Sequence, residues 1–264
     1  MKIAISGKGG VGKSTLAAAL ALMLAQDGQR ILAIDADPDA NLASALGINA
    51  NEQQKIVPIS EHVALIEERT GAKVKQFGQI FKLNPDVADV AEKFAFQHKN
   101  IDLLVLGAIE QGGSGCACPE SVLLRALVTD VVLYKNETLI LDMEAGVEHL
   151  GRATARGVDI MIIVVEPGKR SLDTASRIKR MANDIGITSL AYVANKIYDK
   201  KDELYIKQEL GDMEFIGSIP FSSNLRQADR DGFSVLDQPD ATVLTAFQDI
   251  LQNIKGIANG RYKT

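Results

Sequence analysis

Residues 7–15 read Gly7-Lys8-Gly9-Gly10-Val11-Gly12-Lys13-Ser14-Thr15. This run fits the pattern G-x-x-x-x-G-K-[ST], and it stands between an apolar stretch at Lys2–Ser6 and a helical pattern at Ser14–Gln26. Glycines let backbone N–H groups turn inward around an anion, and the helix N-terminus adds its dipole. The sequence therefore predicts a phosphate-binding loop between a first strand and a first helix.

Short apolar runs rich in Ile, Val and Leu alternate with helical patterns along most of the remaining chain, which indicates βαβ units. Beyond Lys2–Ser6, strands are predicted at Ile31–Asp35, Leu103–Leu106, Thr138–Asp142, Asp159–Val165, Leu190–Asn195 and Phe215–Ile219. Further helices are predicted at Ser171–Ile185 and Thr242–Ile257. We therefore expect an α/β fold with a mostly parallel sheet that is flanked by helices.

A chain of 264 residues can bury a full core as one domain, so we predict a single domain over residues 1–264. The span Asn49–Asn100 differs from the rest because it is more polar and shows no strong strand pattern. Helical spacing occurs within it at Glu61–Arg69 and Val87–Phe96. We predict a helical insertion at about residues 49–100.

The charge and hydrophobicity of the chain argue against nucleic acid and membrane as partners. The net charge is −5 and the isoelectric point is about 5.3, which argues against a nucleic-acid partner because neutralising phosphates needs a basic face. No apolar stretch reaches the roughly 18 residues of a membrane helix, and Met1 leads straight into a strand-like run without a signal-peptide pattern. We expect a cytoplasmic protein that binds neither nucleic acid nor membrane.

The loop and the strand that ends at Asp142 predict an MgATP site. The backbone of Gly7 to Thr15 would surround the phosphates, Lys13 would reach the β- and γ-phosphates, and Ser14 would hold Mg²⁺. Asp142 follows Leu139-Ile140-Leu141, a Walker-B-like strand whose terminal carboxylate would act on Mg²⁺ directly or through water.

Lys8 stands near the start of the loop, where a lysine points away from the phosphates bound by its own chain. At this residue the sequence resembles the MinD/ParA group of P-loop ATPases, whose loop reads KGGxGK[ST]. The resemblance implies that Lys8 crosses a homodimer interface to the partner's nucleotide. It also implies that Asp37, in the run Asp35-Ala36-Asp37-Pro38, orients the attacking water and senses the γ-phosphate. Lys8, Lys13 and Asp37 are thus the predicted catalytic residues.

The base is expected near Ala194-Asn195-Lys196. A guanine reader needs the pattern N-K-x-D, and here Tyr198 takes the place of its Asp. The match is to the strand end by which the MinD/ParA group contacts adenine, so Asn195 is the predicted adenine contact. The expected nucleotide is ATP rather than GTP.

The two cysteines, Cys116 and Cys118, are one residue apart and follow a Gly-Gly pair. Residues i and i+2 of an extended chain face the same way, so both sulfurs can meet one ion. Two thiolates are half of a tetrahedral soft-metal site, which suits Ni²⁺ or Zn²⁺, and a two-fold dimer would supply the other half. The alternative is two small apolar residues in a tight loop.

Taken together, the motifs resemble those of the CooC-type accessory ATPases over essentially the whole chain. The motifs are KGGVGKST, DADPDANL, the C-x-C pair, LDMEAGVEHLGR, VVEP and VANK. The resemblance implies a dimer, promoted by ATP and metal, that assists nickel insertion into carbon monoxide dehydrogenase as its client.

Other members of the ATPase group fit less well. A nitrogenase-iron-protein-like reductase needs two well-separated cysteines, and iron–sulfur carriers use C-x-x-C. A MinD/ParA-type positioning ATPase of the membrane-bound kind needs a basic amphipathic tail, which Asn253–Thr264 makes poorly. A sister maturation factor for acetyl-CoA synthase stays open as an alternative.

Overall fold

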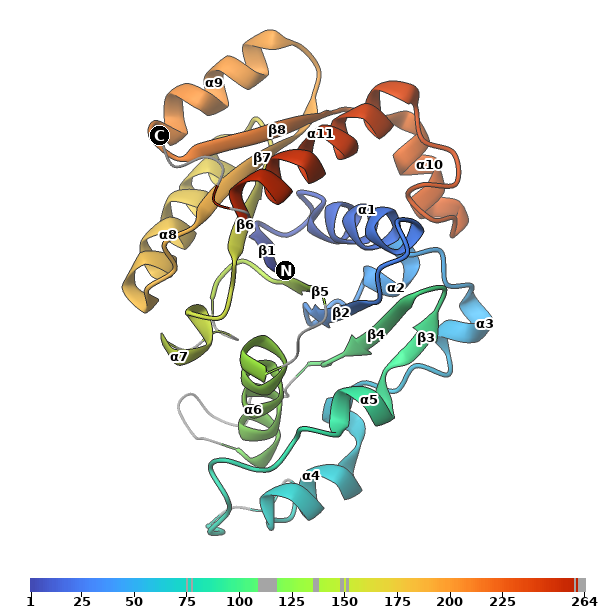
Figure 1. The fold of residues 1–264 in the computed structure, drawn as a ribbon, viewed down its shortest axis with the longest axis vertical. Coiled ribbons are helices and arrows are strands. Elements are labelled where there is room, and N and C mark those ends of the chain that lie inside the picture. Colours follow the sequence, from blue (N-terminus) through green and yellow to red (C-terminus); the bar gives the residue numbers. More distant parts are fainter. Residues whose placement is uncertain are drawn as a thin grey trace.

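The structure is a computed structural model that describes residues 1–74, 76, 78–108, 118–134, 138–147, 150, 152–258 and 260. Within these residues, eight strands form one sheet in the order β3-β4-β2-β5-β1-β6-β7-β8 (Figure 1). Their bounds are β1 Lys2–Gly7, β2 Ile31–Ala36, β3 Phe96–His98, β4 Ile101–Val105, β5 Thr138–Met143, β6 Ile160–Val165, β7 Leu190–Ile197 and β8 Glu214–Pro220.

All seven predicted strands are present, with ends that differ by one or two residues from the predicted ones. Every strand pair is parallel except β3 with β4, where Phe96 pairs with Leu103. The expectation of no strand in residues 49–100 is therefore wrong at its end, because β3 forms the antiparallel edge of the sheet. The mostly parallel α/β fold is confirmed.

Helices connect the strands. They are α1 Lys13–Gln26, α2 Leu42–Ala45, α3 Ala50–Gln53, η1 Ile59–Glu61, α4 Val63–Thr70, α5 Val90–Phe94, α6 Pro119–Tyr134, α7 Arg152–Ala155, α8 Lys169–Ile185, α9 Lys200–Leu210, α10 Ser223–Asp231 and α11 Ala241–Ala258. Among them, α6 stands where the sequence analysis placed no helix. The helix predicted at Val87–Phe96 is shorter, because Phe96 already belongs to β3.

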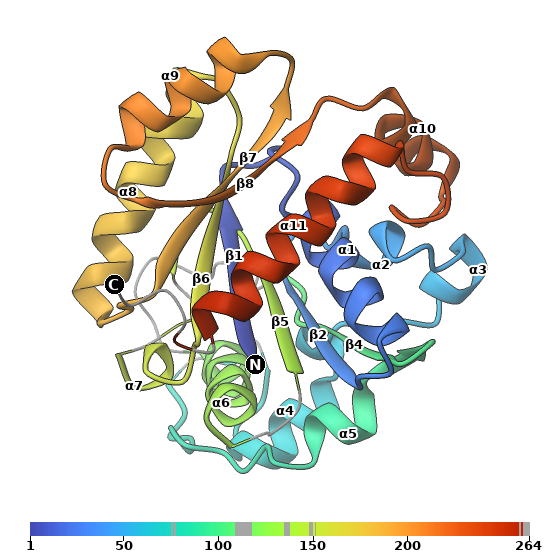
Figure 2. The ribbon, with the colours of Figure 1, turned by 45° about the horizontal axis from the view of Figure 1, so that its top comes forward.

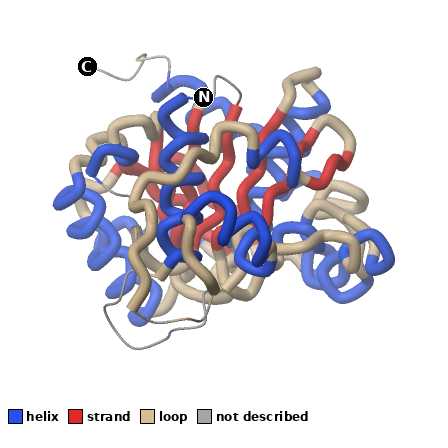
Figure 3. The backbone as a smooth tube through the Cα atoms, turned by 90° about the horizontal axis from the view of Figure 1, so that it is seen from below, coloured by secondary structure: helices blue, strands red, loops and turns tan. Residues whose placement is uncertain are grey.

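The helices cover both faces of the sheet, as Figure 2 and Figure 3 show. One face packs against α1, α2 and α11 through buried side chains such as Leu20, Leu42 and Phe247. The other packs against α4, α6 and α8, with Ile66 and Leu127 among the buried side chains. Because both faces are covered, β2 and β6 are buried along their whole length, which explains their continuous apolar sequences.

Residues 49–100 add short elements to this sheet. They hold α3, η1, α4, α5 and β3, and their apolar side chains join the core cluster under α6. The description of this span as an insertion on one domain stays a prediction. In the part of the chain that the structure describes, no helix combines the length and the apolar character that crossing a bilayer requires.

Candidate functional site

The residues predicted for the nucleotide site lie together at the carboxyl ends of neighbouring strands. Strands β2, β5, β1, β6 and β7 are neighbours in that order, and all run in the same direction. Their carboxyl ends therefore lie on the same side of the sheet, which is where open α/β sheets bind ligands. This side holds Asp35, the phosphate loop, Asp142, Glu166 and Asn195.

The phosphate loop connects β1 to α1 and is shaped by its last glycine. Gly12 adopts a left-handed conformation with φ of 98°, and a Cβ placed on it would lie 2.2 Å from Nδ2 of Asn195. Only glycine fits both constraints at this point. Since α1 begins at Lys13, the N–H groups of its first turn have no intrahelical acceptor and are free to bind an anion.

Lys13 and Asp37, two of the predicted catalytic residues, are in contact. Nζ of Lys13 lies 3.0 Å from Oδ2 of Asp37, and only 6% of the lysine side chain is exposed. A buried lysine needs a counter-charge, and Asp37 supplies it in the absence of phosphate. The loop that holds Asp37 is itself ordered by Oδ1 of Asp35, which accepts a hydrogen bond from the Asp37 N–H at 3.2 Å.

Asp35 and Asp142 face each other across β2 and β5, and both are fully buried. Burial raises the pKa of Asp35 to about 6, although hydrogen bonds from the N–H groups of Leu42 and Asp37 oppose the shift. Burial also raises the pKa of Asp142 to about 7, and the neighbouring charge of Asp35 adds to the shift. Two adjacent buried carboxyls thus compete for ionisation.

Asp142 fits a role in holding Mg²⁺. Among the described residues, neither of its buried oxygens has a hydrogen-bond partner. Ser14 and Lys13 lie close enough to lower the pKa of Asp142 and so to favour its charged form. A hard cation takes oxygen ligands, and a buried carboxylate beside a serine hydroxyl offers them. Asp142 and Ser14 thus offer oxygen ligands that suit Mg²⁺, and the magnesium site itself stays a prediction.

The segment after Asp142 is tied to β1. The hydroxyl of Ser6, which is buried, lies 2.7 Å from the carbonyl oxygen of Glu144 and 3.0 Å from that of Gly146. It also accepts a hydrogen bond from the Gly146 N–H at 3.2 Å. These hydrogen bonds join the end of β1, next to the phosphate loop, to the segment that follows Asp142.

Asn195, on β7, is hydrogen-bonded to the backbone of the phosphate loop. Its Nδ2 donates to the carbonyl oxygen of Val11 at 2.7 Å, and its Oδ1 accepts from the Lys196 N–H at 2.8 Å. Because the carbonyl of Val11 is held toward Asn195, the N–H of Gly12 in the same peptide plane points away from Asn195. The adenine contact of Asn195 stays a prediction.

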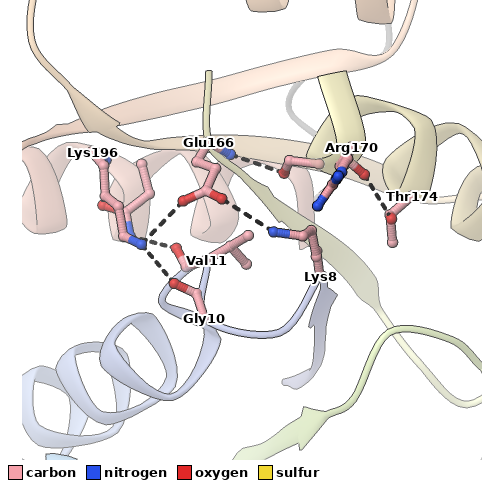
Figure 4. Close-up of polar contacts among 9 residues, drawn as sticks. Lys8, Gly10, Val11, Glu166, Arg170, Thr174 and Lys196 are labelled. Atoms are coloured by element: carbon pink, nitrogen blue, oxygen red, sulfur yellow. Dashed lines mark hydrogen bonds and ion pairs between the residues drawn. The ribbon is translucent and has the colours of Figure 1, made fainter. Parts of the chain in front are cut away.

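Glu166 was not predicted from the sequence, yet it contacts two lysines of this site, Lys8 and Lys196 (Figure 4). It follows β6, and its carboxylate lies 3.5 Å from Nζ of Lys8 and 3.0 Å from Nζ of Lys196. Lys196 also donates to the carbonyl oxygen of Gly10 at 2.6 Å. The signal in the sequence was an acidic residue directly after a buried strand, at Val164-Val165-Glu166-Pro167.

Of the cysteine pair, Cys118 is described, and Cys116 lies outside the described residues. Cys118 directly precedes α6, and its sulfur accepts a hydrogen bond from the Ser121 N–H at 3.4 Å. The thiol thus takes the place of a helix N-cap. Within the described part of the chain, no group of three or more His, Cys, Asp or Glu side chains is placed to hold a metal ion.

Comparisons with known proteins agree with this geometry. Residues 2–235 match the family described as "CobQ/CobB/MinD/ParA nucleotide binding domain". The carbon monoxide dehydrogenase accessory protein CooC of Rhodospirillum rubrum is 46% identical over 237 residues, which cover 90% of each chain. An uncharacterised ATP-binding protein of Methanocaldococcus jannaschii is 48% identical over 228 residues, 85% of this chain and 87% of that one.

Solved structures show the same fold at lower identity. The cell-division protein MinD of Aquifex aeolicus superposes with a TM-score of 0.66 at 23% identity, over 97% of this chain and 98% of that one. MinD of Pyrococcus horikoshii OT3, solved with Mg-ADP, gives a TM-score of 0.68 at 19% identity, over 100% and 99% of the two chains. Identities this low establish the fold alone.

Proposed function

Because this chain belongs to the CobQ/CobB/MinD/ParA nucleotide-binding family, and within it to the CooC-type accessory ATPases, we propose that it assists nickel insertion into a carbon monoxide dehydrogenase. In this proposal the protein is a cytoplasmic homodimer that couples MgATP binding and hydrolysis to the transfer of a metal ion. The observation that carries it is the 46% identity, over nine-tenths of both chains, to an accessory protein of that enzyme.

In the nucleotide site, the phosphates displace Asp37 from Lys13. The ammonium group of Lys13 then neutralises the β- and γ-phosphates, and the released Asp37 carboxylate orients the attacking water. Lys8 of each chain adds its charge to the nucleotide of the partner subunit. Asp142 and Ser14 would hold Mg²⁺, which would neutralise part of the phosphate charge. Asn195 contacts the adenine.

Nickel is the cargo, and the cysteine pair is its carrier. Cys116 and Cys118 of one chain offer two thiolates, and a soft divalent ion such as Ni²⁺ or Zn²⁺ favours four. Dimerisation with ATP would bring the pairs of both chains to one ion. Cys118 supports this role because α6 fixes it at a helix end, where the backbone of Ser121 already orients its sulfur.

The test is activation of nickel-free carbon monoxide dehydrogenase by this protein, nickel and ATP. We expect activity to appear with the wild-type chain and to be absent with Lys13→Ala, which loses the cation for its own nucleotide. Cys118→Ser is expected to bind ATP normally but to activate less than a tenth as much. Serine keeps an oxygen that can cap α6, so this variant removes the thiolate and spares the helix.

Two outcomes would contradict the proposal. Activation by Cys118→Ser at the wild-type level would remove the cysteine pair from the function. Activation that is independent of ATP, or unchanged in Lys13→Ala, would separate the nucleotide site from metal transfer. A client related to acetyl-CoA synthase, offered in parallel to the same proteins, distinguishes the two nickel enzymes.

A further inference from the structure

The carboxylate of Glu166 lies between two lysines that come from different segments. Its Oε1 is 3.5 Å from Nζ of Lys8 in the phosphate loop, and its Oε2 is 3.0 Å from Nζ of Lys196 at the end of β7 (Figure 4). Two ammonium groups share one carboxylate, so the trio has a net charge of +1. One of the two lysines is therefore available to a second anion.

The two lysines are held unequally. Lys196 has a left-handed backbone with φ of 57°, and its Nζ bonds both Glu166 and the carbonyl oxygen of Gly10. Within the described part of the chain, Lys8 has one contact with an acidic side chain, the longer one to Glu166, and 38% of its side chain is exposed. A partly exposed ion pair of this length contributes little and is easily broken. Lys8 is thus the lysine that can leave, while Lys196 remains.

The backbone of Glu166 is held by contacts that involve neither lysine. The N–H of Glu166 donates to the hydroxyl of the buried Ser171 at 3.1 Å. The carbonyl oxygen of Glu166 accepts from the Gly168 N–H at 2.7 Å, and Pro167 restricts the turn between them. Because α8 starts at Lys169, the backbone of Glu166 is held between the end of β6 and this helix, within reach of Lys196 at the end of β7.

We propose that Glu166 is a positioning residue for Lys8: it holds Lys8 inside its own chain until the nucleotide of a second chain takes its place. Release of Lys8 leaves Glu166 neutralised by Lys196, and Lys196 keeps its bond to Gly10. The loop therefore retains its shape while its first lysine is exchanged between a carboxylate and a phosphate. This inference rests on the ATP-dependent dimer of the proposed function.

Glu166→Gln tests the exchange, because glutamine keeps the shape and removes the charge. We expect dimerisation with a non-hydrolysable ATP analogue to become about two- to fivefold tighter, since the ion pair between Lys8 and Glu166 no longer has to be broken. ADP affinity of the single chain should change by less than about twofold, because Lys196 still holds Gly10. Glu209→Gln, on the exposed face of α9, is the matched control and should change neither quantity.

The test also includes a readout on the single chain. With ¹³C at Cε of lysine, the Lys8 resonance is identified by its loss in Lys8→Ala. In nucleotide-free protein, Glu166→Gln should shift this resonance toward its position in the ATP-bound dimer, and Glu209→Gln should leave it unchanged. The double variant Lys8→Ala/Glu166→Gln should dimerise no better than Lys8→Ala alone, because Glu166 acts through Lys8.

The outcomes separate this inference from the function on which it rests. A wild-type chain that stays monomeric with the ATP analogue would overturn the dimeric function, and this inference with it. A wild-type chain that dimerises, with Glu166→Gln equal or weaker, would overturn the inference alone. An unmoved Lys8 resonance, or tightening by Glu166→Gln that persists without Lys8, would also overturn it.

Discussion

The phosphate loop at residues 7–15 and the span at residues 49–100 join the same sheet but are stabilised differently. The loop is held through its backbone, with the carbonyl oxygens of Gly10 and Val11 bonded to Lys196 and Asn195. The 49–100 span is held by apolar side chains and by half-buried ion pairs such as Arg69–Asp89, and Ile80 on its surface is 98% exposed. A loop that needs particular backbone conformations needs particular residues, and these form a recognisable motif. Apolar packing accepts many side chains, so it leaves only a weak periodicity of apolar residues in the sequence.

The largest expected difference is between alanine substitutions at two glycines with similar backbone angles, Gly12 and Gly71. Gly12→Ala should weaken ATP binding by about a hundredfold or more, because strain and a displaced Asn195 bond together cost about 3 kcal/mol. Gly71, with φ of 78° after α4, has open space where a Cβ would lie. Gly71→Ala should cost about 1 kcal/mol of stability and leave ATP binding unchanged.

Isothermal titration with ATP and urea unfolding of both variants provide the two measurements. Equal losses of ATP affinity in Gly12→Ala and Gly71→Ala would show that the loop is no more constrained than the end of α4. That result would remove the contrast between the two regions.

Within the 49–100 span, replacing a buried and an exposed isoleucine by alanine should have different effects on stability. Ile66 of α4 is fully buried under α6, so Ile66→Ala should lower the free energy of unfolding by about 3 kcal/mol. Ile80→Ala should change it by less than about 0.5 kcal/mol, because that side chain is exposed. Comparable losses in urea unfolding would mean that Ile80 is covered in solution.

Acidic residues of the nucleotide site and of the 49–100 span should give opposite dependences of the free energy of unfolding on pH. Burial raises the pKa of Asp142 to about 7 from an ordinary 3.8, so its proton stabilises the nucleotide-free fold at low pH, and this contribution is lost as pH rises through about 7. Asp35 acts in the same direction, with a pKa of about 6. Hydrogen bonds from Arg69 and Lys93 hold the pKa of Asp89 far below its usual range, so its contribution is lost only below about pH 4.

We therefore expect the free energy of unfolding to fall between pH 4 and pH 7 in nucleotide- and magnesium-free protein. One such carboxyl contributes a slope that approaches about 1.4 kcal/mol per pH unit. Asp142→Asn should reduce the slope, and Asp89→Asn should leave it unchanged in this range. Urea unfolding at fixed ionic strength measures it, and an undiminished slope in Asp142→Asn would contradict the assignment.

The sequence predicted the parts of the fold that depend on local pattern. The seven strands and the phosphate loop were recognisable because each requires a short run of particular residues. Helix α6 was missed because its run, Pro119–Tyr134, is apolar on most sides and gives no clear stripe. Strand β3 was missed because three residues form it and its pairing with β4 decides it.

The site was predictable to the same extent. Lys13 and Asp37 were both identified by motif, and the structure brings them to 3.0 Å. The contact of Glu166 with Lys8 and Lys196 depends on β1, β6 and β7 being neighbours, and no local pattern states the order of strands. The structural role of Asp35, which orders the Asp37 loop, depends likewise on its burial between β4 and β5.

The central place of β1 in the sheet also bears on how the chain is made. Its strand neighbours are β5 and β6, with Lys2 beside Leu139 and Ile3 beside Ile160. A ribosome releases β1 before β5 and β6, which follow it by more than a hundred residues. Sheets built from such distant pairings fold slowly. A nascent chain therefore gains its phosphate loop only after residue 165 has emerged, and Lys196 completes it later still.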